Sequence, residues 1–158
     1  MNQTSETRPA GKKVLFCTDF SANADCAFKH AVAAAMSGPG GRLWLLHVIP
    51  EPEAQFWKTY VYEVEGIDEK AKQDIDAKLA ETYFARIPEG LETEVEIRIG
   101  KDYLEILDFA AERKVDLIVL GRQGHSSLGR VLFGNVAERV IRRAVCPVLV
   151  VPIIPANA

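Results

Sequence analysis

The sequence predicts an α/β protein: a three-layer α/β/α sandwich around a five-stranded parallel sheet in the order 3-2-1-4-5, with a Rossmann-like topology. Short apolar runs alternate with amphipathic stretches along the chain, which is the pattern of parallel strands joined by right-handed crossover helices. The third run alternates polar and apolar residues, so one of its faces is wet and it belongs at an edge of the sheet. Ligand-type motifs follow the first and fourth runs, which makes those two strands neighbours at the topological switch point.

The composition is that of one ordinary globular domain. A chain of 158 residues can bury roughly 68–70% of the surface that its unfolded form exposes. Hydrophobic residues make up 48% and charged residues 26%, and no apolar run approaches the ~20 residues that cross a bilayer. We therefore expect a single domain over residues 12–152, a disordered lead-in at residues 1–11, a short tail at residues 153–158, and no membrane association.

Charge and cysteine usage narrow the class further. A formal net charge of −3 argues against sequence-independent nucleic-acid binding, so a bound phosphate would need local donors such as Arg122 and Arg130. The first dozen residues contain no apolar segment of the secretion type, which predicts a cytoplasmic protein. Cys17, Cys26 and Cys146 lie in apolar patterns without a CxxC motif, which favours reduced, packed thiols over a disulfide or a zinc site.

Five runs predict the strands. They cover residues 13–18, 43–49, 91–99, 115–120 and 147–151. All but the third are typical of strands buried on both faces of a parallel sheet. In the third, one face carries Thr93, Val95, Ile97 and Ile99, and the other carries Glu92, Glu94, Glu96 and Arg98.

Four helices are expected between these strands. The first has Ser21 as N-cap and an apolar face of Ala24, Ala27, Phe28, Ala31, Val32 and Ala35. The second, at residues 68–87, buries Ala71, Ile75, Leu79 and Tyr83. The third has Asp102 and Glu105 at capping-box spacing and a stripe of Tyr103, Leu104, Leu107, Ala110 and Ala111. The last turns Phe133, Val136, Val140, Ile141 and Ala144 inward and Arg139, Arg142 and Arg143 outward.

A glycine-punctuated loop joins the fourth strand to the last helix and suits an anion. Strand, loop and helix start bring free backbone N–H groups and the positive end of a helix dipole to one point. The glycine spacing is Gly121, two residues, Gly124, nine residues, Gly134. A Walker A loop is excluded because no Lys-Ser/Thr pair follows the glycines, and the GxGxxG pattern is also absent. The alternative is that these glycines only let a long loop turn.

Two further positions have competing interpretations. Asp19 follows the first strand, where it would meet the glycine loop at the switch point, although a carboxylate there can also cap the next helix. His47 is flanked by apolar residues, which favours a satisfied interior histidine over a ligand. His125, Ser126 and Ser127 would contact phosphate or simply make the loop polar.

These residues resemble the ATP-binding branch of the universal stress protein (UspA-like) family. The glycine spacing is similar to that family's GxxG-x9-G[S/T] signature, and segments 14–21, 45–50, 115–121 and 146–151 are similar as well. The resemblance covers residues 12–152 and implies an adenine nucleotide α-hydrolase-like fold that binds ATP, with Mg²⁺ as a companion ion. It implies these site residues: Cys17, Thr18, Asp19, Val48, Leu120, Gly121, Arg122, Gly124, Gly134, Asn135 and Val136.

The resemblance also implies roles for these residues. Asp19 would hold the ribose or adenine side, and Val48 and the backbone near Cys17 would contact the base. Gly121 and Gly124 would wrap the ribose and phosphates, and residues 134–136 would donate to the phosphates. Asn135 stands where the family has Ser or Thr. Asn is a strong N-cap and Glu138 follows at box-like spacing, so the helix start is retained while a hydroxyl worth about 1 kcal/mol is lost.

The function expected from the sequence is a nucleotide-binding regulatory protein of the stress response. By the resemblance it forms a homodimer through Val148, Leu149, Val150 and Val151 and acts on an unidentified protein partner. One alternative is a slow ATPase, for which Asp19 is the one positioned general base found and no catalytic lysine is present. Another is a stress interaction module that does not bind nucleotide, an alternative raised by Asn135, although this residue does not by itself abolish the site. An adenylating synthetase is disfavoured because Thr18-Asp19-Phe20-Ser21 replaces an SGGxDS-type loop.

Overall fold

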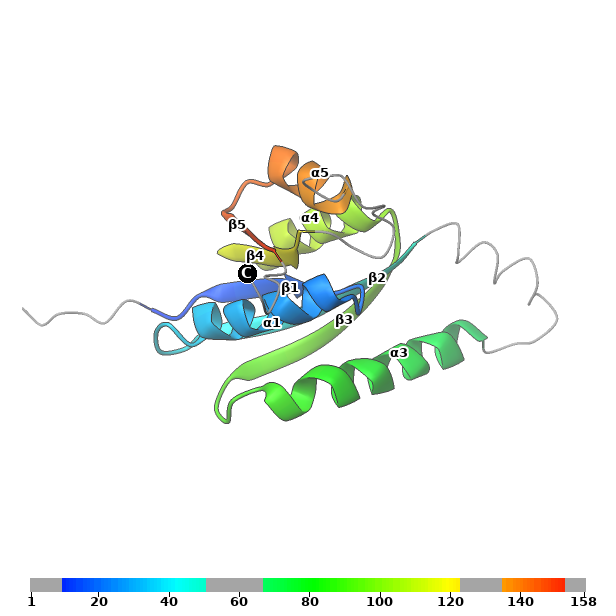
Figure 1. The fold of residues 1–158 in the computed structure, drawn as a ribbon, viewed down its shortest axis with the longest axis horizontal. Helices are drawn as coiled ribbons and strands as arrows, with labels where there is room; N and C mark the ends of the chain where they lie inside the picture. Colours follow the sequence, from blue (N-terminus) through cyan, green and yellow to red (C-terminus); the bar gives the residue numbers. More distant parts are fainter. Residues whose placement is uncertain (1–9, 51–66, 123–134, 153–158) are drawn as a thin grey trace, which may run out of the picture.

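The computed structural model describes residues 10–50, 67–122 and 135–152. The aromatic segment at residues 56–62, most of the glycine loop, nearly all of the lead-in and the C-terminal tail lie outside the described residues. Within the described part, Figure 1 shows a central sheet with helices on both sides, which is the predicted three-layer sandwich.

The sheet has the predicted strand order. Its strands are β1 (Lys13–Cys17), β2 (Arg42–Pro50), β3 (Glu92–Gly100), β4 (Leu117–Gly121) and β5 (Val148–Val151). They are hydrogen-bonded in the order β3-β2-β1-β4-β5, and all four pairings are parallel. β1 therefore lies between β2 and β4, so the chain reverses its direction of strand addition there.

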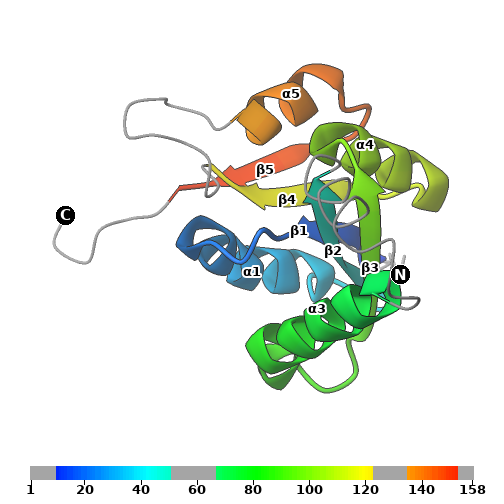
Figure 2. The same cartoon turned by 90° about the vertical axis from the view of Figure 1, so that its right-hand side faces the viewer.

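The helices fall into two layers. They are α1 (Ala22–Ala35), α3 (Ile67–Tyr83) with a 3₁₀ turn η1 (Phe84–Arg86), α4 (Asp102–Arg113) and α5 (Asn135–Arg143). α1 and α3 cover one face of the sheet, and α4 and α5 cover the other, as the two perpendicular views show (Figures 1 and 2).

The core under α1 and α3 is built on aromatic rings and small residues. The rings of Phe16, Phe28 and Tyr83 meet with centroids 4.8–5.4 Å apart. Such edge and tilted contacts stabilise a core beyond the area they bury. Ser21 caps α1 as predicted, because its side chain accepts a hydrogen bond from the Ala24 amide at 3.2 Å. The alanines of the predicted stripe let α1 approach the sheet closely, and Ala24, Ala27, Ala31 and Ala35 are all buried.

The stripe predicted for α4 is wrong at its margins. Ile106 and Phe109 point into the core, whereas Leu104 is 42% exposed and Ala111 is also exposed. The predicted stripe and the face that is buried share Tyr103 and Ala110, so the periodicity of the sequence is compatible with both. The sheet selects the face with the larger ring, since Phe109 packs against Trp44 with centroids 6.0 Å apart.

Two details of the helix starts and faces also differ from expectation. Lys101, not Asp102, occupies the N-cap of α4, and no side chain caps it. Asp102 is the first helical residue, and its carboxylate accepts from the next amide, Tyr103 N, at 2.7 Å. On α5, Ala137 and Val140 are buried as the helix packs on the sheet, but Ile141 is 45% exposed rather than inward, and Phe133 lies outside the described residues.

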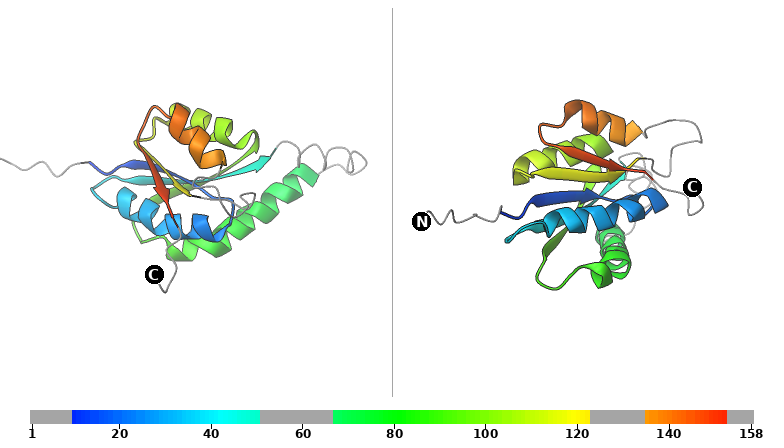
Figure 3. Two further views of the ribbon diagram at one scale, coloured as in Figure 1. Left: turned by 45° about the horizontal axis from the view of Figure 1, so that its top comes forward. Right: turned by 60° about the vertical axis from the view of Figure 1, so that its left-hand side comes forward.

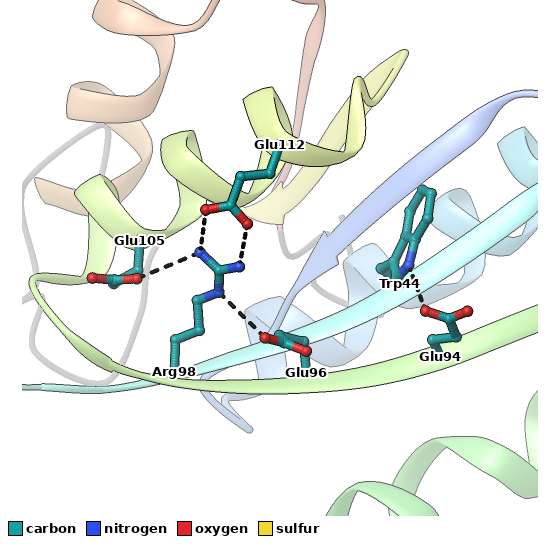
Figure 4. Close-up of polar contacts among 6 residues, drawn as sticks. All are labelled: Trp44, Glu94, Glu96, Arg98, Glu105 and Glu112. Carbon is teal, nitrogen blue, oxygen red and sulfur yellow. Dashed lines mark hydrogen bonds and ion pairs between the residues drawn. The ribbon is translucent and has the colours of Figure 1, made fainter.

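The polar face of β3 is covered at its carboxyl end, at Arg98, whereas the Glu92 and Glu94 side chains stay 65% and 43% exposed. β3 does end the sheet, as predicted, but α4 lies over its charged face (Figure 4). The Arg98 side chain is only 18% exposed. Its guanidinium binds Glu112 at 2.5 and 3.2 Å and also contacts Glu96 and Glu105 at 3.4 and 3.7 Å. The same guanidinium stacks over the Phe109 ring at 4.9 Å. A helix can therefore lie on a charged strand face because the charges are paired with one another.

Candidate functional site

The candidate site lies at the carboxyl ends of β1 and β4. These strands are direct neighbours, with Leu15 opposite Ile118 and Phe16 opposite Val119. The chain leaves β1 into α1 on one face and leaves β4 towards α5 on the other face. Diverging connections of this kind open a crevice beyond the strand ends, which is where ligands bind in open α/β sheets. The predicted switch point is thus confirmed as a feature of the fold.

Thr18 and its neighbours form a well-fixed turn after β1. The Thr18 amide donates to Leu46 O at 3.0 Å, which extends the β1–β2 pairing by one bond. The Thr18 carbonyl lies 2.8 Å from His47 Nδ1. Because a carbonyl oxygen only accepts, Nδ1 carries the proton and donates this bond. His47 thus orients the turn, which agrees with its interpretation as a satisfied interior histidine.

Asp19 and Ser21 share the start of α1. The Ser21 amide donates to Asp19 Oδ1 at 2.9 Å, and Ser21 Oγ in turn accepts from Ala24 N. The helix cap is therefore Ser21, while Asp19 closes the turn before it through an Asx-type bond. This geometry holds the half-buried Asp19 carboxylate at the carboxyl end of β1. Its predicted contact with a ribose stays a prediction.

Four of the predicted site residues share the apolar layer under α4 and α5. Leu120 is 4% exposed and belongs to the buried cluster of this layer, and Cys17, Val48 and Val136 are partly buried and pack against the same cluster. Burial raises the pKa of the Cys17 thiol well above its ordinary value, so the thiol stays protonated and acts as an apolar side chain. The structure thus brings together three strand ends and the first turn of α5 as one apolar wall.

Gly121 has a packing role that the sequence did not reveal. A Cβ atom at this position would come within 2.6 Å of the backbone carbon of Asn23, in the first turn of α1. A glycine is needed here because the end of β4 and the start of α1 touch backbone to backbone. The loop-turning alternative and the ligand-wrapping hypothesis both missed this contact, since it joins segments about a hundred residues apart in the chain.

Arg122 follows β4 directly. Its amide donates to Val151 O at 2.9 Å, which ties the start of the loop to β5. Its Nε atom is buried and has no hydrogen-bond partner among the residues that the structure describes. A buried donor without an acceptor is costly, so this atom is a suitable partner for an anionic ligand.

The far side of the site begins at α5. Asn135 is the first residue of this helix and is exposed. Because α5 connects two parallel strands, it runs against them, and its N-terminus lies at the same edge as the ends of β1 and β4. Glu138 forms an ion pair with Arg142 at 2.8 Å, one turn further on, instead of the box-like arrangement predicted with Asn135. Gly124, Gly134 and the side chains of residues 125–127 and 130 lie outside the described residues.

The described ranges contain neither a metal-binding cluster nor a membrane-spanning helix. Over residues 10–50, 67–122 and 135–152, no three His, Cys, Asp or Glu side chains gather closely enough to hold a metal ion. In the same part of the chain, no helix combines the length and the apolar character needed to cross a bilayer. Mg²⁺ remains a prediction that depends on a bound nucleotide.

Comparison with known proteins places the chain in a family. The Universal stress protein family matches residues 11–152. Among curated relatives, the universal stress proteins MJ0577 and MJ0531 of Methanocaldococcus jannaschii are each 33% identical to it. The alignments cover 89% of this chain, and 94% and 81% of the two relatives.

Solved structures agree with the sequence matches. The structure of MJ0577 has a TM-score of 0.74 with 32% identity and covers 94% of this chain and 100% of that one. The universal stress protein UspA of Lactobacillus plantarum has a TM-score of 0.72 with 27% identity and covers 90% and 99%. A universal stress protein of Archaeoglobus fulgidus in complex with dAMP has a TM-score of 0.61 with 21% identity and covers 89% and 97%, which shows the shared fold alone.

Proposed function

The chain belongs to the universal stress protein family, and we propose that it is a regulatory protein that binds an adenine nucleotide, with ATP as its ligand. The observation that carries this proposal is the convergence of three segments at the switch point: residues 17–19, Val48 and residues 120–122. Nucleotide occupancy would tune the protein's own dimer or its contact with a partner in the stress response.

The apolar wall suits the base. Cys17 and Val48, near the ends of β1 and β2, and Val136, in the first turn of α5, are partly buried against the cluster that contains Leu120, so each offers apolar surface. When a flat aromatic ring covers this surface, apolar area of both the ring and the protein is removed from water. The Cys17 thiol adds no charge to this wall, since its raised pKa keeps it neutral.

The polar groups proposed for the site are of the kinds that a nucleotide requires. The Asp19 carboxylate would accept from the ribose hydroxyls. Arg122 Nε is a buried donor without an acceptor among the described residues, and the N-terminus of α5 supplies the positive end of a helix dipole for the phosphates. The more distant structural neighbour with dAMP gives one example of an adenine nucleotide bound to this fold.

The test is to measure ATP binding to the whole chain by calorimetry. We expect Asp19→Asn to weaken ATP binding about tenfold. This is the loss expected when a hydrogen bond to a charged acceptor is replaced by one to a neutral acceptor. The Asn oxygen can still accept from Ser21 N, so the turn before α1 is kept. The matched control is Asp108→Asn, which removes the same charge at an exposed position on α4.

A ribose contact has a further signature in the ligand. Wild-type protein should bind ATP more tightly than 2′,3′-dideoxy-ATP, and Asp19→Asn should narrow that difference. Equal ATP affinity in Asp19→Asn and wild type would remove Asp19 from the site. If the protein binds no ATP at millimolar nucleotide, the remaining function is the interaction module that does not bind nucleotide. Phosphate release that exceeds background and vanishes in Asp19→Ala would instead establish the slow ATPase.

A homodimer through β5 completes the proposal. β5 ends the sheet beside β4 (Figure 3). Pro147 and Val151 use their carbonyls to accept from β4, at Ile118 N and Arg122 N. Since successive residues of a strand point their backbone groups to opposite sides, those of Val148 and Val150 face away from β4. A second copy of the chain would pair with these groups and cover the exposed Leu149 side chain.

A further inference from the structure

Tyr83 carries a hydroxyl that the core packing does not require. It is the last residue of α3 and only 1% exposed, and its ring packs against Phe16 and Phe28. A phenylalanine would fill the same space, and a buried hydroxyl is costly unless it is hydrogen-bonded. The Tyr83 hydroxyl lies 2.5 Å from Thr18 Oγ1, in the turn after β1. The bond therefore joins the end of α3 to the candidate nucleotide site.

Thr18 links Tyr83 to the backbone of the turn. Its Oγ1 accepts from the Phe20 amide at 3.0 Å, so one hydroxyl bridges Tyr83 and Phe20. Phe20 has a φ of 62°, in the left-handed region that a bulky residue rarely adopts. Such a conformation persists only where the surroundings hold it. The Thr18 bridge is one of the contacts that hold it.

The Phe20 side chain is held by α3 as well. Its ring stacks with that of Tyr83 at a centroid distance of 6.3 Å, and Lys78 Nζ lies 4.4 Å from the Phe20 centroid. From the sheet, the His47 ring lies 4.9 Å from it while His47 Nδ1 binds Thr18 O. The turn at residues 18–21 is thus fixed between β2 and α3, and α3 supplies both the hydroxyl and the cation.

We propose that Tyr83 is a positioning residue of the nucleotide site, through which α3 sets the affinity for ATP. This inference rests on the proposed function, because the turn that Tyr83 fixes carries Thr18 and Asp19. In this role Tyr83 acts through Thr18 and not on the ligand itself. Its hydroxyl fixes Thr18, Thr18 fixes the backbone at Phe20, and the same turn presents the Asp19 carboxylate. A change in the position of α3 would alter nucleotide affinity by the same route.

The matched pair of variants is Tyr83→Phe and Phe28→Leu. Tyr83→Phe removes the hydroxyl alone, whereas Phe28→Leu loosens packing against the same Tyr83 ring without touching the turn. We expect Tyr83→Phe to weaken ATP binding roughly fivefold, which is the effect of losing one hydrogen bond of typical net strength. Phe28→Leu should lower the melting temperature at least as much and leave ATP affinity within about twofold of wild type. Equal losses of affinity in the two variants would overturn the inference, since a purely structural role predicts them.

Two further measurements strengthen the test. Thr18→Ser keeps the hydroxyl and should bind ATP nearly as wild type. Thr18→Val removes the bonds to both Tyr83 and Phe20, so it should lose at least as much ATP affinity as Tyr83→Phe, and adding Tyr83→Phe to it should cause little further loss. Amide exchange of Phe20 and Ser21 in nucleotide-free protein should accelerate in Tyr83→Phe beyond the change in global stability. Additive losses, or unchanged exchange at these two amides, would contradict the proposal.

The outcomes separate this inference from the function on which it rests. If wild-type protein binds ATP and Tyr83→Phe binds it equally well, the positioning role fails and the nucleotide site stands. If wild-type protein binds no ATP, the proposed function fails, and the role of Tyr83 in affinity fails with it. Faster exchange at Phe20 and Ser21 would then show only that the hydroxyl orders the turn.

Discussion

The two edges of the sheet are built in opposite ways. β3, at one edge, has nine residues, and four charged side chains project from its polar face. β5, at the other, has four residues that are all valine or leucine. An exposed strand edge invites another strand, and charges together with a covering helix discourage it. The chain thus protects one edge and leaves the other apolar.

The protection of β3 depends on pairing its charges. Arg42 on β2 binds Glu92 and Glu94 at 2.5 and 2.7 Å, and Trp44 Nε1 donates to Glu94 at 3.1 Å. Arg98 joins the strand to α4 through Glu112, as Figure 4 shows. Strand pairing by a second chain would have to disrupt or desolvate these groups. The difference between the edges favours β5 over β3 as the place for the proposed dimer.

The largest expected effect is at the apolar edge. Leu149→Glu places a carboxylate in the proposed interface, where it would be buried without a partner. We expect the dimer to weaken by about 3 kcal/mol, or roughly 100-fold in Kd, which sedimentation over a concentration series will measure. The control is Leu104→Glu, the same change at a comparably exposed position on α4, 42% against 38% exposed. A wild-type monomer at micromolar concentration, or equal effects of both variants, would contradict the β5 dimer.

The second effect concerns the protected edge. Arg98→Ala leaves Glu96, Glu105 and Glu112 without their shared cation and uncovers the Phe109 ring. We expect a loss of about 2 kcal/mol in the free energy of unfolding, measured by urea denaturation. Arg142→Ala, which breaks an exposed i,i+4 pair with Glu138, should cost only about 0.3 kcal/mol. If the two losses were similar, the Arg98 cluster would be no more than a solvated surface pair.

The smallest effect is a pH dependence of the same cluster. The hydrogen bond from Arg98 holds the pKa of Glu112 below its ordinary value of 4.5. A carboxylate with a lowered folded-state pKa stabilises the fold above its unfolded pKa and loses that contribution as the pH falls through the folded value. The stability difference between wild type and Glu112→Gln should therefore be constant near neutral pH and shrink below about pH 4.5. A difference that stays constant down to pH 3 would show that Arg98 does not stabilise this carboxylate.

The candidate site shows how far local patterns reach. The sequence places Cys17, Thr18, Asp19 and Val48 at strand ends, and the strand order brings those ends together. Ser21 was identifiable as a cap because its side chain bonds to the amide of Ala24, which lies nearby in the sequence. The bond between Thr18 and Tyr83 could not be found in this way, since its partners are 65 residues apart. The same holds for the contact of Gly121 with Asn23.

What the sequence determined by itself was the set of strands, their order and the face that α1 buries. Apolar periodicity predicts the strands and the buried face of α1, and the order follows from the polar alternation of the third run together with the motifs after the first and fourth runs. The tertiary structure decided between faces that the periodicity left equivalent. It turned Phe109 rather than Leu104 into the core, exposed Ile141 and laid α4 over the charges of β3. The physical reason is that a stripe fixes which residues share a face, whereas the shape and charge of the opposing surface fix which face is buried.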